Sequence, residues 1–257
     1  MSAQARDQAR DPARVQARDE PSNQPSDQAR KRAALWILGA GGHGRVVADA
    51  AAASGRFAEI VFFDDDATLG PQVGRWPVRG NSQAFIAAAA PDKPDSDAAP
   101  PERHIGIGDN QRRDQWARRC ESQGLALATV AHPAAVVSID AVLAPGCFVA
   151  AGAVVAPGAE LGVAVVVNHG ASVDHDGRIG RAAHIGPGAH LGGTVTVGEL
   201  AWIGLGAAVR HGARIGARAM VGAGAVVVAD VADEARVVGN PARSLPDPFG
   251  NQGPLRA

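Results

Sequence analysis

The sequence predicts a chain in two parts, a small α/β domain with a parallel sheet followed by an all-β parallel β-helix built from hexapeptides. Residues 34–130 alternate short apolar runs with helical patterns, and from Val137 to Val227 a Val, Ile or Leu stands at every sixth position. Gly and Ala are abundant, while only 4% of the residues are aromatic. This composition suits stacked layers of small side chains better than a core filled by large rings.

The α/β part begins with an apolar run at 34–38, a glycine turn at 39–44 and a helical pattern at 45–54. Strand, glycine turn and helix is the order of a βαβ unit. Further strands are expected at 59–63, 104–108 and 125–130, and Asp109 is expected to cap a helix over 111–122. We therefore place this domain at 33–130.

The period of six matches neither the 3.6 residues of a helical turn nor the alternation of a hairpin, but it is the signature of hexapeptide β-helices. Three hexapeptides close one triangular coil, with the aliphatic side chain inside, so about five coils without a long inserted loop are expected over 131–243. A second inward set, two positions before the first, is almost entirely small. A β-sandwich would show irregular spacing instead.

The two ends of the chain differ from both parts. Residues 1–32 repeat Gln-Ala-Arg-Asp among prolines, which predicts a disordered tail, with a short helical interaction arm as the alternative. Residues 244–257 are expected to form a C-terminal tail, and the Pro-rich stretch 91–101 a surface loop.

The charge and the apolar pattern exclude several classes of partner. The formal net charge is −1, so no global positive field would hold nucleic acid or an acidic membrane surface. No apolar run reaches the length of a membrane span, and the N-terminus is polar. Cys120 and Cys147 cannot form a disulfide framework or a four-thiolate zinc site. We expect a cytoplasmic protein in a reducing compartment.

The glycine turn carries a phosphate-binding pattern. Gly39, Gly41 and Gly44 fit G-x-G-x-x-G, and Asp64 follows Gly44 by 20 residues, which together match the dinucleotide fingerprint. An NAD enzyme is one interpretation, but a domain over 33–130 is short for both halves of a dinucleotide fold. Backbone N–H groups at a helix N-terminus can hold the diphosphate of a nucleotide-sugar equally well.

Six motifs follow one another between residues 34 and 245: Leu38-Gly-Ala-Gly-Gly-His-Gly44, Phe63-Asp-Asp65, Gly106-Ile-Gly-Asp-Asn110, Ala131-His-Pro-Ala-Ala-Val136, Ala171-Ser-Val-Asp-His-Asp-Gly177 and Val238-Gly-Asn-Pro-Ala242. With them the chain resembles the sialic-acid O-acetyltransferase and UDP-amino-sugar N-acetyltransferase family. The resemblance implies a Rossmann-like domain for the nucleotide-sugar, a left-handed β-helix for the co-substrate acetyl-CoA, and a homotrimer with active sites between subunits.

The resemblance also implies roles for individual residues. His175 matches the general base and Asp176 the carboxylate that orients it, although relatives often carry the longer Glu at this place. The acetyl-CoA end of the site is matched by His184, Asn168 and the backbone N–H of Gly193. The nucleotide-sugar pocket is matched by Gly39, Gly41, Gly42, His43, Gly44, Asp64 and Asp65.

The chemistry of the histidines supports these roles independently. His175 follows the inward Val173 by two residues, so it lies outside the triangular core, and Gly193 occupies the coil above it. Acyl transfer needs a base and a donor to the developing oxyanion, and this pair would supply an imidazole and a backbone N–H. A solvated polar corner between Asp174 and Asp176 is the alternative.

A metal site is a further alternative, because γ-class carbonic anhydrases bind zinc with three interfacial histidines on this type of β-helix. Four histidines occur at 169, 175, 184 and 190, but their spacing gives no close pair on one side, so no metal is expected.

The sequence thus predicts an acetyltransferase that moves acetyl from acetyl-CoA to an amino group of a nucleotide-activated sugar by direct attack. No covalent acyl-enzyme is expected, because Cys147 belongs to the inward small set and Cys120 to a helix. O-acetylation of sialic acid or of another sugar hydroxyl is the nearest alternative. A non-catalytic β-helix scaffold would need neither the glycine loop nor the His175-Asp176 pair.

Overall fold

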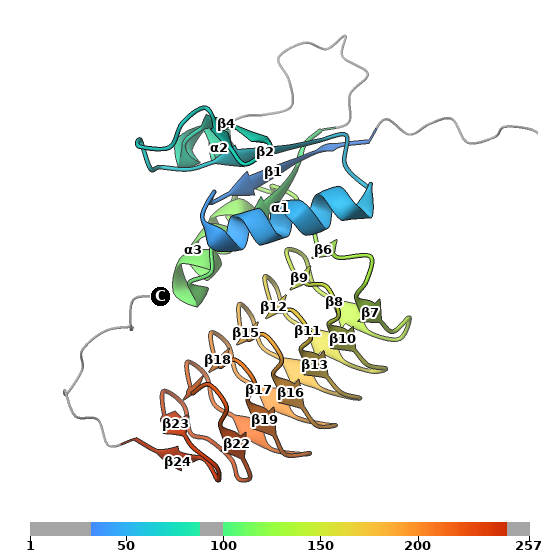
Figure 1. The fold of residues 1–257 in the computed structure, drawn as a ribbon, viewed down its shortest axis with the longest axis vertical. Coiled ribbons are helices and arrows are strands. Elements are labelled where there is room, and N and C mark those ends of the chain that lie inside the picture. The colour runs from blue at the N-terminus through green and yellow to red at the C-terminus, as the bar shows by residue number, and fades with distance from the viewer. Residues whose placement is uncertain (1–31, 88–99, 246–257) are drawn as a thin grey trace, which may run out of the picture. The chain divides into compact units, whose positions relative to one another are not determined.

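The computed structural model describes residues 32–87 and 100–245 (Figure 1). The predicted N-terminal tail, the loop at 91–101 and the C-terminal tail lie almost entirely outside these residues.

The N-terminal part contains a five-stranded sheet in the order β3-β4-β2-β1-β5. Its strands β4, β2, β1 and β5 are parallel, and β3 pairs antiparallel with β4. The expected strands at 34–38 and 59–63 are confirmed to the residue. β3 and β4 were not predicted, because β3 has only two residues and β4 contains a proline, an arginine and a glycine. The strands are β1 (Ala34–Leu38), β2 (Glu59–Phe63), β3 (Gln72–Val73), β4 (Trp76–Gly80) and β5 (Glu102–Ile105).

The helices of this part are α1 (Gly42–Ser54), α2 (Ser82–Ala87) and α3 (Asn110–Ser122). Helix α1 begins within the glycine turn, three residues earlier than predicted, with Gly41 as its N-cap. Asp109 is confirmed as the N-cap of α3, because its Oδ1 accepts a hydrogen bond from the N–H of Arg112 at 2.8 Å.

The prediction that residues 125–130 form the last strand of this sheet is wrong. Leu127 makes only an isolated bridge to Arg103 of β5, and the next strand, β6 (Val130–Ala131), pairs with β9 of the β-helix. The N–H of Val130 donates to the carbonyl of Cys147, so this segment starts the first coil instead of extending the sheet. The apolar run alone could not distinguish the two sheets.

From β7 onward every hexapeptide contributes one two-residue strand, and the second residue of each is the predicted aliphatic position. Each strand pairs in parallel with the strands one coil below and one coil above, giving three sheets around one core (Figure 1). This is the predicted β-helix, with the predicted register. The strands are β7 (Val136–Val137), β8 (Val142–Leu143), β9 (Phe148–Val149), β10 (Val154–Val155), β11 (Glu160–Leu161), β12 (Val166–Val167), β13 (Ser172–Val173), β14 (Arg178–Ile179), β15 (His184–Ile185), β16 (His190–Leu191), β17 (Thr196–Val197), β18 (Trp202–Ile203), β19 (Ala208–Val209), β20 (Arg214–Ile215), β21 (Met220–Val221) and β22 (Val226–Val227).

Glycines after the aliphatic positions allow the coils to stack closely. A Cβ on Gly180, for example, would lie 2.6 Å from the backbone nitrogen of Glu199 in the next coil. The chain closes with β23 (Arg236–Val238) and β24 (Arg243–Ser244) on the sheet that begins with β6.

The two parts share an apolar core. Phe148, Ala150 and Val166 of the β-helix belong to the same buried cluster as Leu35 and Val47 of the N-terminal sheet and helix. Because these side chains are buried together, the position of α1 relative to the coils is fixed by packing.

Candidate active site

His175 and Asp176 form a polar pair at the turn after β13. Nδ1 of His175 lies 2.9 Å from Oδ2 of Asp176, and the His175 N–H donates to Oδ1 of Asp174 at 2.7 Å. Asp176 adopts a left-handed φ of 56°. Gly158, one coil below, leaves space for its carboxylate, since a Cβ there would lie 2.5 Å from Asp176 Oδ1. The shorter Asp at this place therefore still reaches the imidazole.

The carboxylates raise the pKa of His175 above its ordinary value. The hydrogen bond that His175 donates to Asp176 contributes most, and the charges of Asp174 and Asp176 add to it, while partial desolvation opposes the shift. The His175 side chain remains 51% exposed. When Nδ1–H is donated to Asp176, Nε2 carries the free lone pair that a general base needs.

Gly193 covers His175 without a side chain. A Cβ on Gly193 would collide with Nε2 of His175, and the two coils are held together by the hydrogen bond from the Thr194 N–H to the His175 carbonyl at 2.8 Å. Among the described residues the Gly193 N–H has no hydrogen-bond acceptor. The next side chain above is His211, whose ring centroid lies 6.0 Å from that of His175. A half-exposed imidazole and a backbone N–H without an acceptor in the described residues therefore lie next to each other.

His184 and Asn168 lie elsewhere on the β-helix. His184 is in β15, which belongs to the sheet that starts with β6, whereas His175 follows a strand of a different sheet. Nδ2 of Asn168 is 3.1 Å from Nε2 of His184, and the His184 ring lies 4.2 Å from Trp202 and 6.1 Å from His43. Within one copy of the chain, the structure thus groups His184 with Asn168 and His43, and it does not bring them to His175.

The histidines at this junction are held neutral. Burial, reinforced by the charge of Arg113, lowers the pKa of His43 to about 3 and that of His184 well below its ordinary value. Burial likewise lowers the pKa of His104 to about 4. Nε2 of His43 is buried without a hydrogen-bond partner in the described part of the chain.

The glycine turn opens into a cavity of about 750 Å³. Gly41 and Gly42 have open space where a Cβ would be, and N–H groups of the first turn of α1 begin at this point. A helix N-terminus with uncovered backbone is suited to an anionic group. The cavity is lined by Leu38, Gly39, Gly41, Gly42, His43, Asp64, Asp65, Gly106, Ile107, Gly108, Asp109, Arg112 and Trp116.

The other expected pocket residues shape the turn itself. A Cβ on Gly44 would collide with the carbonyl oxygen of Gly39, so Gly44 serves the close packing of α1 on the turn. Asp64 Oδ2 accepts a hydrogen bond from the Ala40 N–H at 2.7 Å, and Asp65 Oδ1 accepts one from the Ser82 N–H at 2.8 Å. These carboxylates border the cavity while bracing its walls.

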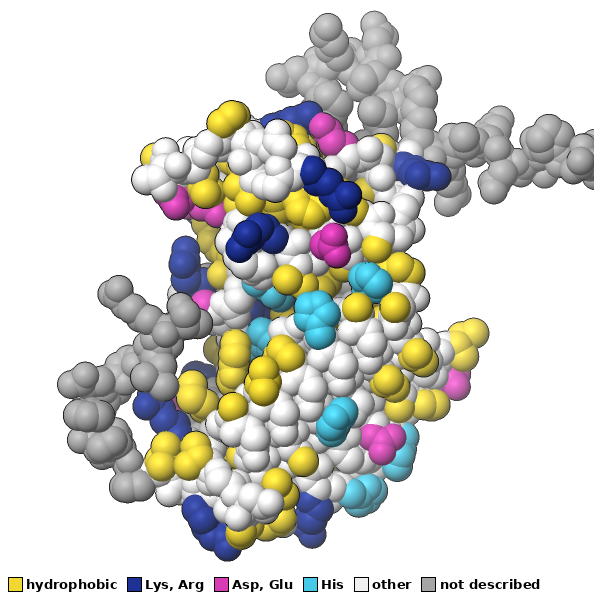
Figure 2. Space-filling model, in the orientation of Figure 1, with side chains coloured by type: hydrophobic (Ala, Val, Ile, Leu, Met, Phe, Trp, Pro, Cys, Tyr) yellow, Lys and Arg dark blue, Asp and Glu magenta, His cyan; other side chains and the backbone are white. Residues whose placement is uncertain are grey.

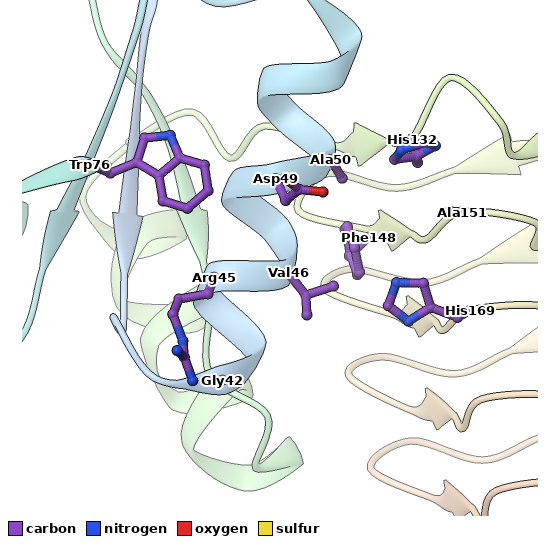
Figure 3. Close-up of a pocket in the computed structure, with 10 residues that line it drawn as sticks. All are labelled: Gly42, Arg45, Val46, Asp49, Ala50, Trp76, His132, Phe148, Ala151 and His169. Atoms are coloured by element: carbon purple, nitrogen blue, oxygen red, sulfur yellow. The ribbon is translucent and has the colours of Figure 1, made fainter. Parts of the chain in front are cut away.

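A second cavity of about 450 Å³ lies between α1 and the coils (Figure 3). It meets the first at Gly42, and it is lined by Arg45 and Asp49 of α1 and by His132 and His169 of the β-helix. Figure 2 shows that histidines gather on this side of the β-helix, below the N-terminal domain. This cavity was not predicted from the sequence, because its lining residues come from α1, from Trp76 and from three separate places in the β-helix.

Three further residues at the larger cavity were not predicted, and they follow the motif at 106–110. Arg112 and Trp116 line the larger cavity, and Arg113 lies buried behind it. Their helical spacing from Asp109 was the available signal, since α3 begins at the next residue.

Neither cysteine is suited to act as a nucleophile. Burial raises the pKa of Cys120 to about 11 and that of Cys147 to about 12. In residues 32–87 and 100–245, no three His, Cys, Asp or Glu side chains are grouped so that they could hold a metal ion. No helix within these ranges is long and apolar enough to cross a membrane.

Comparisons with known proteins identify similar acetyltransferases. Residues 34–120 match the family model of the PglD N-terminal domain. The acetyltransferase domain of PglB from Neisseria gonorrhoeae is 39% identical, with 82% of this chain and 99% of that chain covered and a TM-score of 0.77. A variant of perosamine N-acetyltransferase from Caulobacter crescentus, in complex with CoA and GDP-perosamine, is 35% identical over 83% of this chain and 97% of that chain, with a TM-score of 0.75.

A third solved structure, WeeI from Acinetobacter baumannii, is 26% identical, covers 82% of this chain and 99% of that chain, and has a TM-score of 0.73. The search of the curated proteins found no match.

Proposed function

Because this chain belongs to the hexapeptide-repeat sugar acetyltransferases, we propose that it transfers acetyl from acetyl-CoA to an amino group of a nucleotide-activated sugar. The PglB domain has been solved with acetyl-CoA, and the perosamine enzyme with CoA and GDP-perosamine. The observation that carries the proposal is the His175-Asp176 pair beneath the bare backbone of Gly193.

The reaction joins the acceptor nitrogen to the acetyl carbon and breaks the carbon–sulfur bond of the thioester. Nε2 of His175 takes the proton of the attacking amine, and Asp176 stabilises the resulting imidazolium through Nδ1. The Gly193 N–H donates to the oxyanion that develops on the carbonyl. The proton on His175 then passes to the departing thiolate, so that CoA leaves as a thiol.

Direct attack on the thioester requires no acyl-enzyme. Both cysteines are buried and keep their protons, whereas His175 is half exposed and can be reached by an external amine. The two free thiols also accord with the cytoplasmic location expected from the sequence.

The acceptor binds at the glycine turn in this proposal. Its diphosphate accepts hydrogen bonds from the backbone at the N-terminus of α1, where Gly41 and Gly42 leave the approach open. The cavity of about 750 Å³ has the size of sites for ligands of this kind.

The active site is shared between copies of the chain in a homotrimer. In one copy His175 is separated from His184 and Asn168, which lie on another sheet, and packing β-helices side by side would bring the two groups together. The first coil carries an exposed apolar patch suited to such packing, with Ile139 98% exposed and Val136 and Val142 each 62% exposed. Ile139 and His175 occupy equivalent corners two coils apart, so the patch and the base share one edge.

The activity is tested by a screen of nucleotide-activated amino sugars against acetyl-CoA, read by the release of free thiol. Each sugar is paired with its hydroxyl counterpart, so that transfer to nitrogen and to oxygen is distinguished. Thiol release that depends on an amino sugar supports the proposal. Release with hydroxyl sugars alone, or no dependence on a nucleotide-sugar, would contradict it.

A further inference from the structure

Arg113 of α3 is buried at the junction of the two parts, with 1% of its surface exposed. Its guanidinium donates to the carbonyl oxygens of Ile107 and Gly108 at 3.0 and 2.8 Å. It also donates to those of Ala164 and Ala182, both at 2.9 Å. The Oδ1 of Asn110 accepts the remaining bond at 2.7 Å. All five donors of the fork are therefore used.

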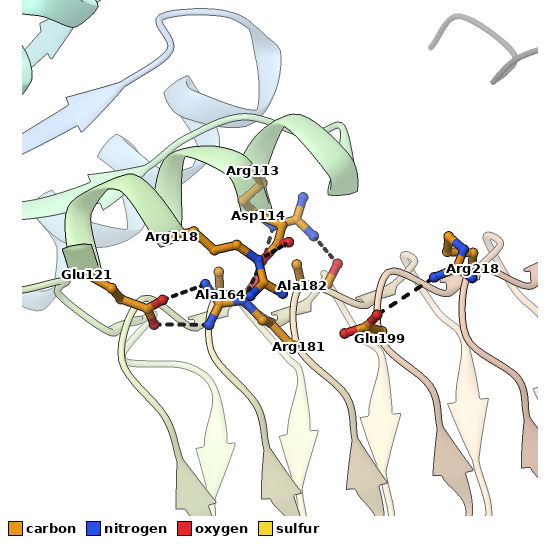
Figure 4. A network of polar contacts seen from close by, with 9 residues as sticks. All are labelled: Arg113, Asp114, Arg118, Glu121, Ala164, Arg181, Ala182, Glu199 and Arg218. Atoms are coloured by element: carbon orange, nitrogen blue, oxygen red, sulfur yellow. Dashed lines mark hydrogen bonds and ion pairs between the residues drawn. The ribbon is translucent and has the colours of Figure 1, made fainter.

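These acceptors come from two functional regions. Ile107 and Gly108 line the larger cavity, whereas Ala164 and Ala182 occupy the same corner of successive coils (Figure 4). Asn110 extends the series, since its Nδ2 donates to the carbonyls of Leu200 and Ala201 at 3.0 Å each. One short segment of α3 thus binds three successive coils and the cavity wall at once.

Stability alone is a weak reason for this arrangement. Among the described residues no carboxylate lies within ion-pair distance of Arg113, so a cation is buried on neutral oxygen atoms. Burying a charge is costly, and apolar side chains of similar volume often stabilise such sites as well or better. A planar guanidinium that binds several backbone carbonyls instead fixes the positions of these carbonyls relative to one another.

We propose, on the basis of the acetyl transfer proposed above, that Arg113 is a positioning residue: it locks the wall of the nucleotide-sugar cavity to the coils and so sets where the acceptor amine meets the acetyl group. Displacements of about 1 Å can lower rates about a hundredfold, so such a lock would be visible in kinetics. Burial is the main cause that lowers the pKa of His43 and of His184, and the charge of Arg113 adds to it.

The test compares Arg113→Lys with Arg181→Lys. Lysine keeps the charge but has three donors on a single atom, so it cannot hold the loop and both coils. Arg181 also joins α3 to the β-helix, through Asp114 and Glu121, but none of its bonds reaches the loop at 107–109 (Figure 4). Arg181→Lys therefore weakens the docking of α3 without removing a bond to the loop at 107–109.

The measured quantities are kcat and KM for both substrates, with Tm as a check on folding. Arg113→Lys is expected to lower kcat/KM for the nucleotide-sugar about ten- to a hundredfold, with the KM for acetyl-CoA within about twofold of wild type. Arg181→Lys is expected to lower Tm and leave kcat/KM within about threefold. Arg113→Lys with unchanged kcat/KM, or an equal loss in Arg181→Lys, would overturn the proposal.

If Arg113→Lys fails to fold, Asn110→Leu provides the second arm, because it removes one acceptor of Arg113 and both bonds to the third coil. The same split between the two substrates is expected, and equal effects on both would count against the proposal. Wild-type enzyme is assayed alongside: its failure to acetylate any nucleotide-sugar refutes the function itself, whereas an active wild type with active variants refutes only the role of Arg113.

Discussion

The histidines of this chain differ in surroundings that follow from single neighbouring residues. His175 has carboxylates on both sides and a bare glycine above, so its pKa rises and its Nε2 stays accessible. His43 and His184 are shielded from water, which lowers their pKa values most, and the charge of the buried Arg113 lowers them further. The same side chain is thus prepared as a base in one place and as a neutral packing group in the other.

The pH dependence of the reaction should reveal the influence of Asp176 on His175. The rate increases as His175 loses its proton, and the raised pKa places this inflection above the ordinary value of about 6.5. Asp176→Asn removes the largest cause of the shift, so the inflection of kcat/KM against pH should move to lower pH, together with a reduced plateau. An inflection that stays in place in the variant would show that another group titrates.

The sequence predicted the position of His175 and its neighbour Gly193, but it did not predict the grouping of the other histidines. The period of six places 175 two residues after an inward position and Gly193 in the coil above, which the structure reproduces. The grouping of His43 with His184 depends on how α1 packs on the coils, and no local pattern encodes such a contact between distant segments.

Among the elements, α1 shows how glycines of one loop have different roles. At Gly41 and Gly42 a side chain would meet no atom of the described chain within 4 Å, whereas at Gly44 it would collide with the turn itself. The first two therefore keep the approach to the helix N-terminus open, and the third allows the helix to pack.

Gly41→Val and Gly44→Ala should separate these roles. Gly41→Val is expected to raise the KM for the nucleotide-sugar about ten- to a hundredfold, which corresponds to the loss of one or two hydrogen bonds to a charged group. Acetyl-CoA binding and Tm should stay nearly unchanged. Gly44→Ala is expected to lower the free energy of unfolding by about 1–3 kcal/mol, because the loop is overpacked. Steady-state kinetics and urea unfolding measure the two effects, and equal weakening of both substrates by Gly41→Val would refute the phosphate role.

Among the apolar segments, the sheet that each one joins is not always evident from its pattern. β1, β2 and all the hexapeptide strands carry strong apolar patterns that belong to one sheet each. The run at 125–130 is equally apolar but leaves the N-terminal sheet, because its end pairs with the first coil. An apolar run indicates that a segment is buried, and only tertiary structure decides which neighbour buries it.

The molecule as a whole joins two folds through a junction with three neutral histidines, of which His104 and His184 are buried and His43 is half-buried. The folded chain holds His43, His104 and His184 without the proton, while the unfolded chain binds it below a pH of about 6.5. Because the unfolded state then binds more protons, the free energy of unfolding must fall as pH falls through this range.

Acid should therefore destabilise the protein well before its carboxylates titrate. Each of the three histidines contributes about 1.4 kcal/mol per pH unit between pH 6.5 and its folded pKa. His43→Leu removes one of these three histidines and, with it, a buried nitrogen that has no hydrogen-bond partner in the described residues. In urea titrations the free energy of unfolding of this variant should therefore fall less than that of wild type between pH 6.5 and 5. Replacing the exposed His211 with Gln provides the control. An equal slope in His43→Leu and wild type would contradict this account.

The exposed patch on the first coil should control assembly. Wild type is expected to have three times the chain mass of 26.1 kDa in light scattering. Ile139→Asp places a charge on a side chain that is 98% exposed in one copy, so it should leave the fold intact and shift the mass toward one chain. Activity should fall with dissociation, since His175 would lose the partner copy. A fully active monomer would contradict a shared site.

The effect of His175→Ala on turnover tests the central claim most directly. With a nucleotide-activated amino sugar and acetyl-CoA at saturation, kcat should fall about 10² to 10⁴-fold, the range for loss of a general base, while acetyl-CoA binds with nearly the wild-type Kd. Because the His175 side chain is half exposed, its replacement should not unfold the protein, and an unchanged Tm would verify this. A variant that keeps more than about a third of the wild-type kcat, far above that range, would show that the proton leaves by another route.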